Sequence, residues 1–145
     1  MSLTIRRSRK DEGDKLVSIW CRSVDATHHF LSPDYRLELE GLVRSFLPEA
    51  PLWVAVTEQD EPVAFMLLTD QHMDALFVDP DARGRGVGKL LIVHALSMTS
   101  TLTTNVNEQN EQAVGFYKKM GFSVTGRMEV DDLGRPYPLL SLVHG

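Results

Sequence analysis

Three glycines lie close together between an apolar segment and a segment whose apolar residues have helical spacing. They are Gly84, Gly86 and Gly88, and they follow residues 75–78 and the strand-breaking pair Asp79-Pro80. Because glycine has no Cβ, the backbone can turn tightly here and a ligand can approach the amide N–H groups closely. A glycine-rich turn that opens a helix exposes unpaired N–H groups and the positive end of the helix dipole. The turn therefore predicts an anion site, most often one for a phosphate.

Two common phosphate-binding motifs do not fit this turn. A Walker-type loop that ended at Gly88-Lys89 would need glycine and Ser or Thr at the positions of Arg83 and Leu90. A dinucleotide-binding fingerprint that began at the first or second glycine would need another glycine in place of Lys89 or Leu91. The pattern that does fit is Arg-x-x-Gly-x-Gly. A strand-to-helix turn without a ligand stays an alternative interpretation.

A second motif follows a short strand that we expect at residues 102–106. It has the form Asn-x-x-Ala-x-x-x-Tyr-x-x-x-Gly-Phe. Asparagine favours a helix start, because its side chain accepts a hydrogen bond from a free N–H group of the first turn. Glycine favours a helix end. The residues in this register are Asn110, Ala113, Tyr117, Gly121 and Phe122.

Together the two motifs resemble those of the GCN5-related N-acetyltransferase (GNAT) family, and the resemblance covers nearly the whole chain. In that family the first motif, Gln/Arg-x-x-Gly-x-Gly/Ala, binds the pyrophosphate of acetyl-coenzyme A (acetyl-CoA). The resemblance implies that acetyl-CoA is the cosubstrate and that no metal is needed. Arg83 would either contact a phosphate or stabilise the turn. The implied cosubstrate-binding residues are Phe77, Val78, Arg83, Gly84, Arg85, Gly86, Val87, Gly88, Lys89, Asn110 and Tyr117.

The order of the expected elements is β-α-α-β-β-β-α-β-α-β-β in a single domain, residues 1–145. This alternation predicts an α/β fold with a mixed sheet of about seven strands flanked by helices. Ser8 with Asp11, and Ser32 with Pro33, are the expected start signals of the first two helices. The resemblance adds a splay between strands four and five, where the pantetheine arm lies. The strands are expected at residues 3–7, 52–57, 63–68, 71–78, 102–106, 123–130 and 139–143.

Acetyl transfer to an amine needs a base, because a lysine amine has a reference pKa of about 10.4 and is almost fully protonated at pH 7. The alternation of a strand predicts that His72, Asp74, Leu76 and Val78 share one face. GNAT proteins often carry a glutamate base at the position of His72, so histidine is a departure from the family pattern. His72 as the base, Asp74 acting through water, and neither acting directly all stay open.

Tyr117 is the candidate general acid. A tyrosine phenol has a reference pKa of about 10 and keeps its proton at neutral pH. The resemblance places the tyrosine at this position near the cosubstrate sulfur, where it would protonate the departing thiolate. The alternative interpretation is an aromatic residue on the buried face of a helix, beside Phe116.

Composition limits the partners. The chain has 145 residues with 43% hydrophobic and 24% charged residues, which is typical of one globular domain. It has no apolar run long enough for a membrane helix, and its single cysteine, Cys21, cannot form an internal disulfide. Because the first residues lack an apolar segment, we expect no secretory leader. We expect a cytoplasmic protein that is a monomer or a homodimer. The net charge of −5 argues against nucleic-acid binding and suits a cationic acceptor.

The acceptor is the least defined part of the prediction. In the GNAT family the acceptor pocket is built from variable loops, which here are residues 27–35 and 131–138. Tyr137 could form an aromatic wall or pack the hairpin. The adjacent His28 and His29 are interpreted as solvated loop residues rather than a metal site, with a role in guiding the acceptor as the alternative. We predict an N-acetyltransferase for a primary amine, with a protein lysine favoured. The alternatives are a small amine or polyamine acceptor, an acetyl-CoA sensor without turnover, and a toxin that acetylates charged tRNA.

Overall fold

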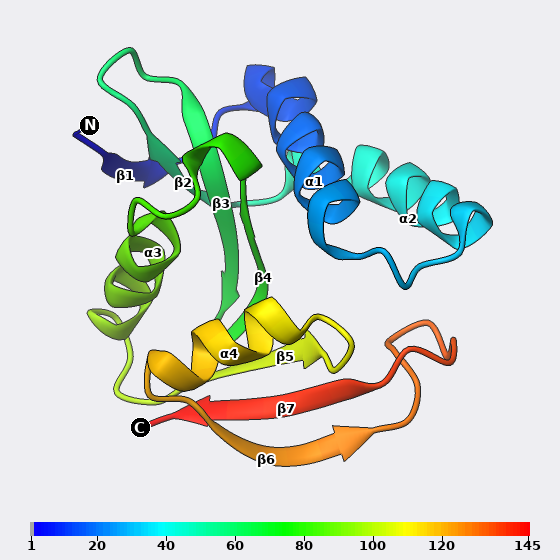
Figure 1. The fold of residues 1–145 in the computed structure, drawn as a ribbon. Coiled ribbons are helices and arrows are strands. Elements are labelled where there is room, and N and C mark those ends of the chain that lie inside the picture. Colours follow the sequence, from blue (N-terminus) through cyan, green and yellow to red (C-terminus); the bar gives the residue numbers. More distant parts are fainter. Residues whose placement is uncertain (1) are drawn as a thin grey trace.

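The computed structural model describes residues 2–145 and has the expected order of elements (Figure 1). The strands are β1 (Thr4–Arg7), β2 (Trp53–Val56), β3 (Pro62–Thr69), β4 (His72–Val78), β5 (Leu102–Asn107), β6 (Ser123–Met128) and β7 (Leu139–His144). The α-helices are α1 (Gly13–Thr27), α2 (Pro33–Phe46), α3 (Val87–Leu96) and α4 (Glu111–Lys119). The predicted α/β architecture is therefore confirmed.

The seven strands form one mixed sheet in the order β1-β2-β3-β4-β5-β7-β6. All neighbours are antiparallel except β4 and β5, which run parallel. These two strands pair at only two positions, His72 with Thr103 and Met73 with Thr104. Beyond them the strands diverge, so that Figure 1 shows β4 and β5 running in different directions. This divergence is the predicted splay.

The helices cover the two faces of the sheet. On one face α1 packs against β2, β3 and β4, and its buried residues include Leu16 and Ile19. On the other face α3 and α4 bury a second cluster, to which Leu91 and Tyr117 belong. The sheet is thus buried on both sides in its centre. The splay opens between these two cores.

Local start signals explain the helix ends, with one correction. Ser32 caps α2, since its Oγ accepts a hydrogen bond from the Tyr35 N–H at 3.2 Å. Asn110 caps α4 in the same way, through the Ala113 N–H at 3.3 Å. Ser8 does not begin the first helix. Its N–H instead donates to the Leu52 carbonyl at 2.9 Å, because it lies where β1 leaves the sheet.

The predicted alternation along β4 is also wrong in its first half. The register between β3 and β4 shifts between the pairs Leu67–Ala75 and Leu68–Met73, which leaves Asp74 in a β-bulge. As a result Met73 lies in the same buried cluster as Leu76, although an uninterrupted strand would put them on opposite faces. The bulge changes the side on which every residue before it lies. His72 therefore does not share a face with Leu76 and Val78.

The core beneath α3 offers a test of stability. Leu91 is fully buried on α3, and Leu91→Ala should lower the free energy of unfolding by about 2–5 kcal/mol, because the cavity cannot close completely. Val93 lies on the same helix with half of its surface exposed, so Val93→Ala should change the free energy by about 0.5 kcal/mol or less. Urea denaturation of both variants measures the difference. Equal losses would contradict this packing.

Candidate active site

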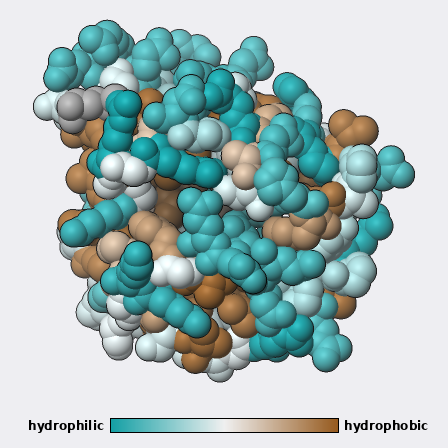
Figure 2. All heavy atoms as spheres, in the orientation of Figure 1, coloured by the Kyte–Doolittle hydropathy of each residue, from teal (hydrophilic) through white to brown (hydrophobic). Residues whose placement is uncertain are grey.

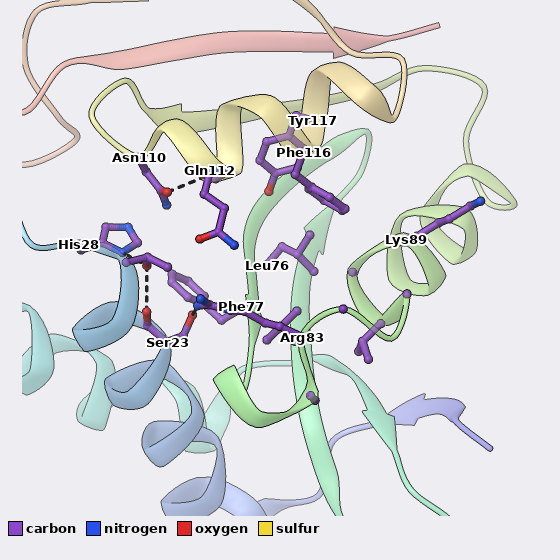
Figure 3. Close-up of a pocket in the computed structure, with 18 residues that line it drawn as sticks. Ser23, His28, Leu76, Phe77, Arg83, Lys89, Asn110, Gln112, Phe116 and Tyr117 are labelled. Carbon is purple, nitrogen blue, oxygen red and sulfur yellow. Dashed lines mark hydrogen bonds between the residues drawn. The ribbon is translucent and has the colours of Figure 1, made fainter. Parts of the chain in front are cut away.

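A cleft of about 320 Å³ opens where β4 and β5 separate. In the same orientation as Figure 1, Figure 2 shows hydrophobic atoms lining a hollow that hydrophilic side chains surround. The cleft is lined by residues of α1, β4, the β4–α3 turn, α3 and α4, which Figure 3 draws as sticks. Ten of the expected cosubstrate-binding residues line it: Phe77, Val78, Arg83, Gly84, Gly86, Val87, Gly88, Lys89, Asn110 and Tyr117.

The glycine turn has the geometry of an anion site. Gly84 and Gly86 adopt φ values of +77° and +74°, which side chains with a Cβ rarely adopt. Gly88 is needed for a different reason, because a Cβ there would lie 3.0 Å from the Phe116 ring. Gly86 is the N-cap of α3 and no side chain caps this helix. The first N–H groups of α3 are therefore available to a phosphate.

Contacts from α1 hold the turn in place. The Arg22 guanidinium lies 2.7 Å from the Asp81 carboxylate and 3.3 Å from that of Asp79. Arg83 donates a long hydrogen bond of 3.5 Å to the Ser23 hydroxyl, so its side chain crosses from the turn to α1. Between the two roles that the sequence left open for Arg83, this contact favours stabilisation of the turn.

The Tyr117 side chain comes from α4 and its ring is almost completely buried, with 6% of the residue exposed. Figure 3 shows its hydroxyl pointing toward the open space of the cleft. Burial raises the pKa of Tyr117 well above its usual value, so the phenol is protonated at any physiological pH. Within residues 2–145 no protein group makes a hydrogen bond to this hydroxyl. Tyr117 is thus a protonated donor that faces the cleft.

His28 is a cleft residue that the sequence interpretation assigned to a solvated loop. It follows the last residue of α1, and its N–H donates to the Val24 carbonyl at 2.7 Å. Its ring packs against Phe30 and Phe77, with centroid distances of 5.3 and 6.5 Å. Burial, with smaller effects of Arg83 and His29, lowers the pKa of His28 to about 4. The ring is neutral at pH 7.

The two predicted base candidates lie elsewhere. His72 and Asp74 stand near the start of β4, and neither lines the cleft. The His72 Nδ1 atom is 2.8 Å from the Thr103 hydroxyl, and Asp74 accepts a hydrogen bond of 2.5 Å from Thr69. The His72 Nε2 atom is 3.7 Å from the Asp74 carboxylate. Arg85 belongs to the glycine turn but does not line the cleft either.

The two loops expected to form the acceptor pocket contact each other. The ring of Tyr137, in the β6–β7 loop, stacks on that of Tyr35 with a centroid distance of 5.1 Å and an interplanar angle of 8°. The Tyr137 hydroxyl accepts a hydrogen bond of 3.1 Å from the Ser32 N–H. Tyr35 in turn donates a short hydrogen bond to Asp131. Tyr137 therefore joins the two loops, although neither Tyr35 nor Tyr137 lines the cleft.

Neither a metal site nor a membrane span emerges from residues 2–145. In that range no three His, Cys, Asp or Glu side chains come close enough together to hold a metal ion. No helix in the described part of the chain is both long and apolar enough to cross a membrane.

Comparison with known proteins identifies the family that this turn, cleft and splayed sheet define. A family model described as "Acetyltransferase (GNAT) domain" matches residues 26–134. The chain belongs to the GNAT family and is an N-acetyltransferase that uses acetyl-CoA. The expectations for the family, the fold and the cosubstrate are confirmed.

Two curated relatives are similar over nearly their whole length. The chain is 75% identical to the peptidyl-lysine N-acetyltransferase YjaB of Escherichia coli K12, over 99% of this chain and 98% of that protein. It is 73% identical to YjaB of Salmonella typhimurium LT2, over 99% of both. The solution structure of apo-form YjaB from Escherichia coli, with 75% identity, matches with a TM-score of 0.97 over 99% of this chain and 98% of that chain.

More distant structures share the fold. The PaiA N-acetyltransferase of Thermoplasma acidophilum, solved in complex with coenzyme A, matches with a TM-score of 0.80. Its sequence identity is 18%, and the match covers 99% of both chains.

The glycine turn can be tested with acetyl-CoA alone. Gly86→Asp places a Cβ and a negative charge at the N-cap of α3, where φ is +74°. We expect the affinity for acetyl-CoA, measured by calorimetry, to fall at least about tenfold, which is about 1.4 kcal/mol. Gly134→Asp is a matched control, because Gly134 has a φ of +76° in the distant β6–β7 loop. Unchanged binding in Gly86→Asp would contradict a phosphate site at this turn.

The His28 ring can be tested by NMR. Since its pKa is lowered from 6.5 to about 4, the imidazole should show neutral-ring nitrogen shifts down to about pH 4. The unfolded chain takes up this proton at a higher pH than the folded chain. His28 therefore contributes stability that is lost as the pH falls from about 6.5 to about 4. A charged His28 ring at pH 6 would refute the buried environment described above.

Proposed function

We propose that this enzyme acetylates the side-chain amine of lysine residues in proteins, with Tyr117 as the general acid. The observation that carries the proposal is the Tyr117 hydroxyl, which faces the cleft beside the glycine turn and has no competing hydrogen bond within residues 2–145. The choice of acceptor is supported by the two relatives at 75% and 73% identity, both named as peptidyl-lysine N-acetyltransferases.

In this proposal the backbone holds the cosubstrate. The N–H groups of the turn, from Arg85 to Lys89, bind the pyrophosphate. Asp79 donates its N–H to the Val63 carbonyl of β3, so by alternation the backbone groups of Phe77 also face β3 and those of Val78 face the splay. Val78 therefore offers its backbone groups to the pantetheine arm, and Phe77 contributes its side chain to the cleft. The Asn110 side-chain amide is available to the arm on the opposite side, while its oxygen caps α4.

The proton of Tyr117 then goes to sulfur. Attack of the amine on the thioester carbonyl breaks the C–S bond, and the thiolate leaves into the same apolar surroundings that raise the pKa of Tyr117. A buried thiolate is also more basic than one in water, because burial disfavours its charge. Proton transfer from the phenol removes that buried charge. The step therefore needs no second acid.

Two other functions are weaker on specific grounds. An acetyl-CoA sensor without turnover would not need a protonated phenol in the cleft. A polyamine acceptor would favour carboxylates at the site, whereas no Asp or Glu lines the described cleft.

Cys21 is a free thiol, which suits the reducing cytoplasm in which we place the enzyme.

Tyr117→Phe tests the acid. Removal of the hydroxyl should lower kcat for a lysine peptide about 10²-fold or more, because a general acid contributes at least that much. Binding of acetyl-CoA, measured by calorimetry, should stay close to wild type, since the ring and its packing are kept. CoA release, detected with a thiol reagent, gives the rate. Wild-type turnover in this variant would remove Tyr117 as the acid.

The acceptor class needs a separate comparison. We expect an Nα-acetylated peptide with one lysine to be a better substrate than spermidine at equal concentration. The same peptide with arginine in place of lysine should release no CoA above the background hydrolysis. A preference for spermidine would overturn the lysine assignment and leave the acetyltransferase activity intact.

A further inference from the structure

The cleft contains four titratable side chains within the described residues, and only one of them can accept a proton. They are His28, Arg83, Lys89 and Tyr117. Arginine and lysine side chains are donors without an acceptor atom. Lys89 also points away from the cleft in Figure 3, and the Tyr117 phenol keeps its proton. His28 is therefore the one cleft side chain suited to receive a proton from an amine.

A hydrogen-bonded chain fixes the tautomer of His28. Its Nδ1 atom lies 2.7 Å from the Thr27 hydroxyl, which lies 2.8 Å from the Ser23 carbonyl. The carbonyl has no proton to give, so both contacts are hydrogen bonds only if Thr27 donates to Ser23 and accepts from the His28 Nδ1–H. The lone pair of the neutral ring is then on Nε2. No bond within residues 2–145 occupies Nε2.

The backbone of His28 is equally restrained. Its N–H is bound to the Val24 carbonyl at 2.7 Å, and its carbonyl accepts from the Leu31 N–H at 3.1 Å. The ring lies between Phe30 and Phe77. Phe77 belongs to the part of β4 that borders the splay, so the ring stands beside the proposed path of the pantetheine arm. Figure 3 shows His28 at the end of α1 and Tyr117 on α4, both at the cleft.

We propose that His28 is the catalytic base, and that its Nε2 atom takes the proton from the attacking amine. This inference rests on the proposed acetyl transfer, but not on the identity of the acceptor. The amine nitrogen forms a bond to the thioester carbon, and the C–S bond breaks. One amine proton passes to Nε2 of His28, and the Tyr117 proton passes to the thiolate. Solvent then removes the proton from His28 and restores that of Tyr117.

The charges around His28 determine the protonation state of its ring. The charged groups that act on the ring are Arg83, from the turn, and His29, from its own loop. The cleft residues that β4 and α4 contribute are uncharged, including the Tyr117 phenol. Burial and these two groups keep the lone pair free at pH 7, with a pKa of about 4. Once acetyl-CoA is bound, its anionic pyrophosphate near Arg83 would offset the positive charge of Arg83 and raise the pKa of His28.

The decisive variant is His28→Asn. The asparagine amide can still donate to Thr27 in place of Nδ1–H, but the acceptor at Nε2 is lost. We expect kcat at pH 7 to fall about 10²-fold or more, with acetyl-CoA binding unchanged. The deficit should shrink toward pH 9–10 (roughly the range where hydroxide replaces a missing base). A purely structural role predicts either little loss or a loss that is the same at every pH.

The control variant is His72→Gln. His72 is the histidine that the family position suggests as a base, yet it does not line the cleft. It should keep wild-type kcat and the wild-type pH profile within about twofold, in line with a residue outside the transition-state contacts. A large loss in His72→Gln together with full activity in His28→Asn would overturn our assignment.

Two amines keep the proposals separable. Each enzyme is assayed for CoA release with the lysine peptide and with n-butylamine, which has only the chemistry of the lysine side chain. If wild type uses n-butylamine but not the peptide, the lysine-protein proposal fails, and the His28 comparison is decided with n-butylamine. If wild type releases CoA with neither amine, both proposals are refuted. A pH-independent loss in His28→Asn refutes the base alone.

Discussion

The structure depends on the incomplete pairing of β4 with β5. Parallel strands side by side would normally bond along their whole length, because buried N–H and C=O groups need partners. Here the two strands pair at two positions and then separate. The remaining edge of β4 must obtain its partners from something that is not part of the sheet. The free edge of β4 has the hydrogen-bonding groups that an extended chain, such as a pantetheine arm, could pair with as a further strand would.

The order of elements along the chain determines which residues lie on each side of the gap between β4 and β5. The strand that borders the gap runs directly into the glycine turn, so one segment carries both the free edge of β4 and the N–H groups at the start of α3. The helix that follows β5 brings Tyr117 from the other side. Salt bridges of Arg22 to Asp79 and Asp81 tie α1 to the turn. Because α1 ends at the cleft, this connection also sets the place of His28.

Much of this arrangement could be predicted from the sequence because it depends on local signals. Neighbouring residues in the chain predict the helix starts at Ser32 and Asn110. They also predict the glycines that adopt a positive φ in the turn before α3. What failed depended on tertiary structure. The bulge at Asp74 moves the residues before it to the opposite face of the sheet. No glycine or proline at this point of the sequence predicts the bulge. The position of His28 was missed, since its ring packs against Phe77 and is affected by the charge of Arg83, and both residues are distant in sequence.

The stack of Tyr137 on Tyr35 connects two loops that are about 100 residues apart in the sequence. The loops at residues 27–35 and 131–138 are joined by ring stacking and by the bond from the Ser32 N–H to the Tyr137 hydroxyl. A change of shape in one loop therefore displaces the other. The two loops behave as one unit, and a substitution that moves either Tyr35 or Tyr137 changes the shape of both.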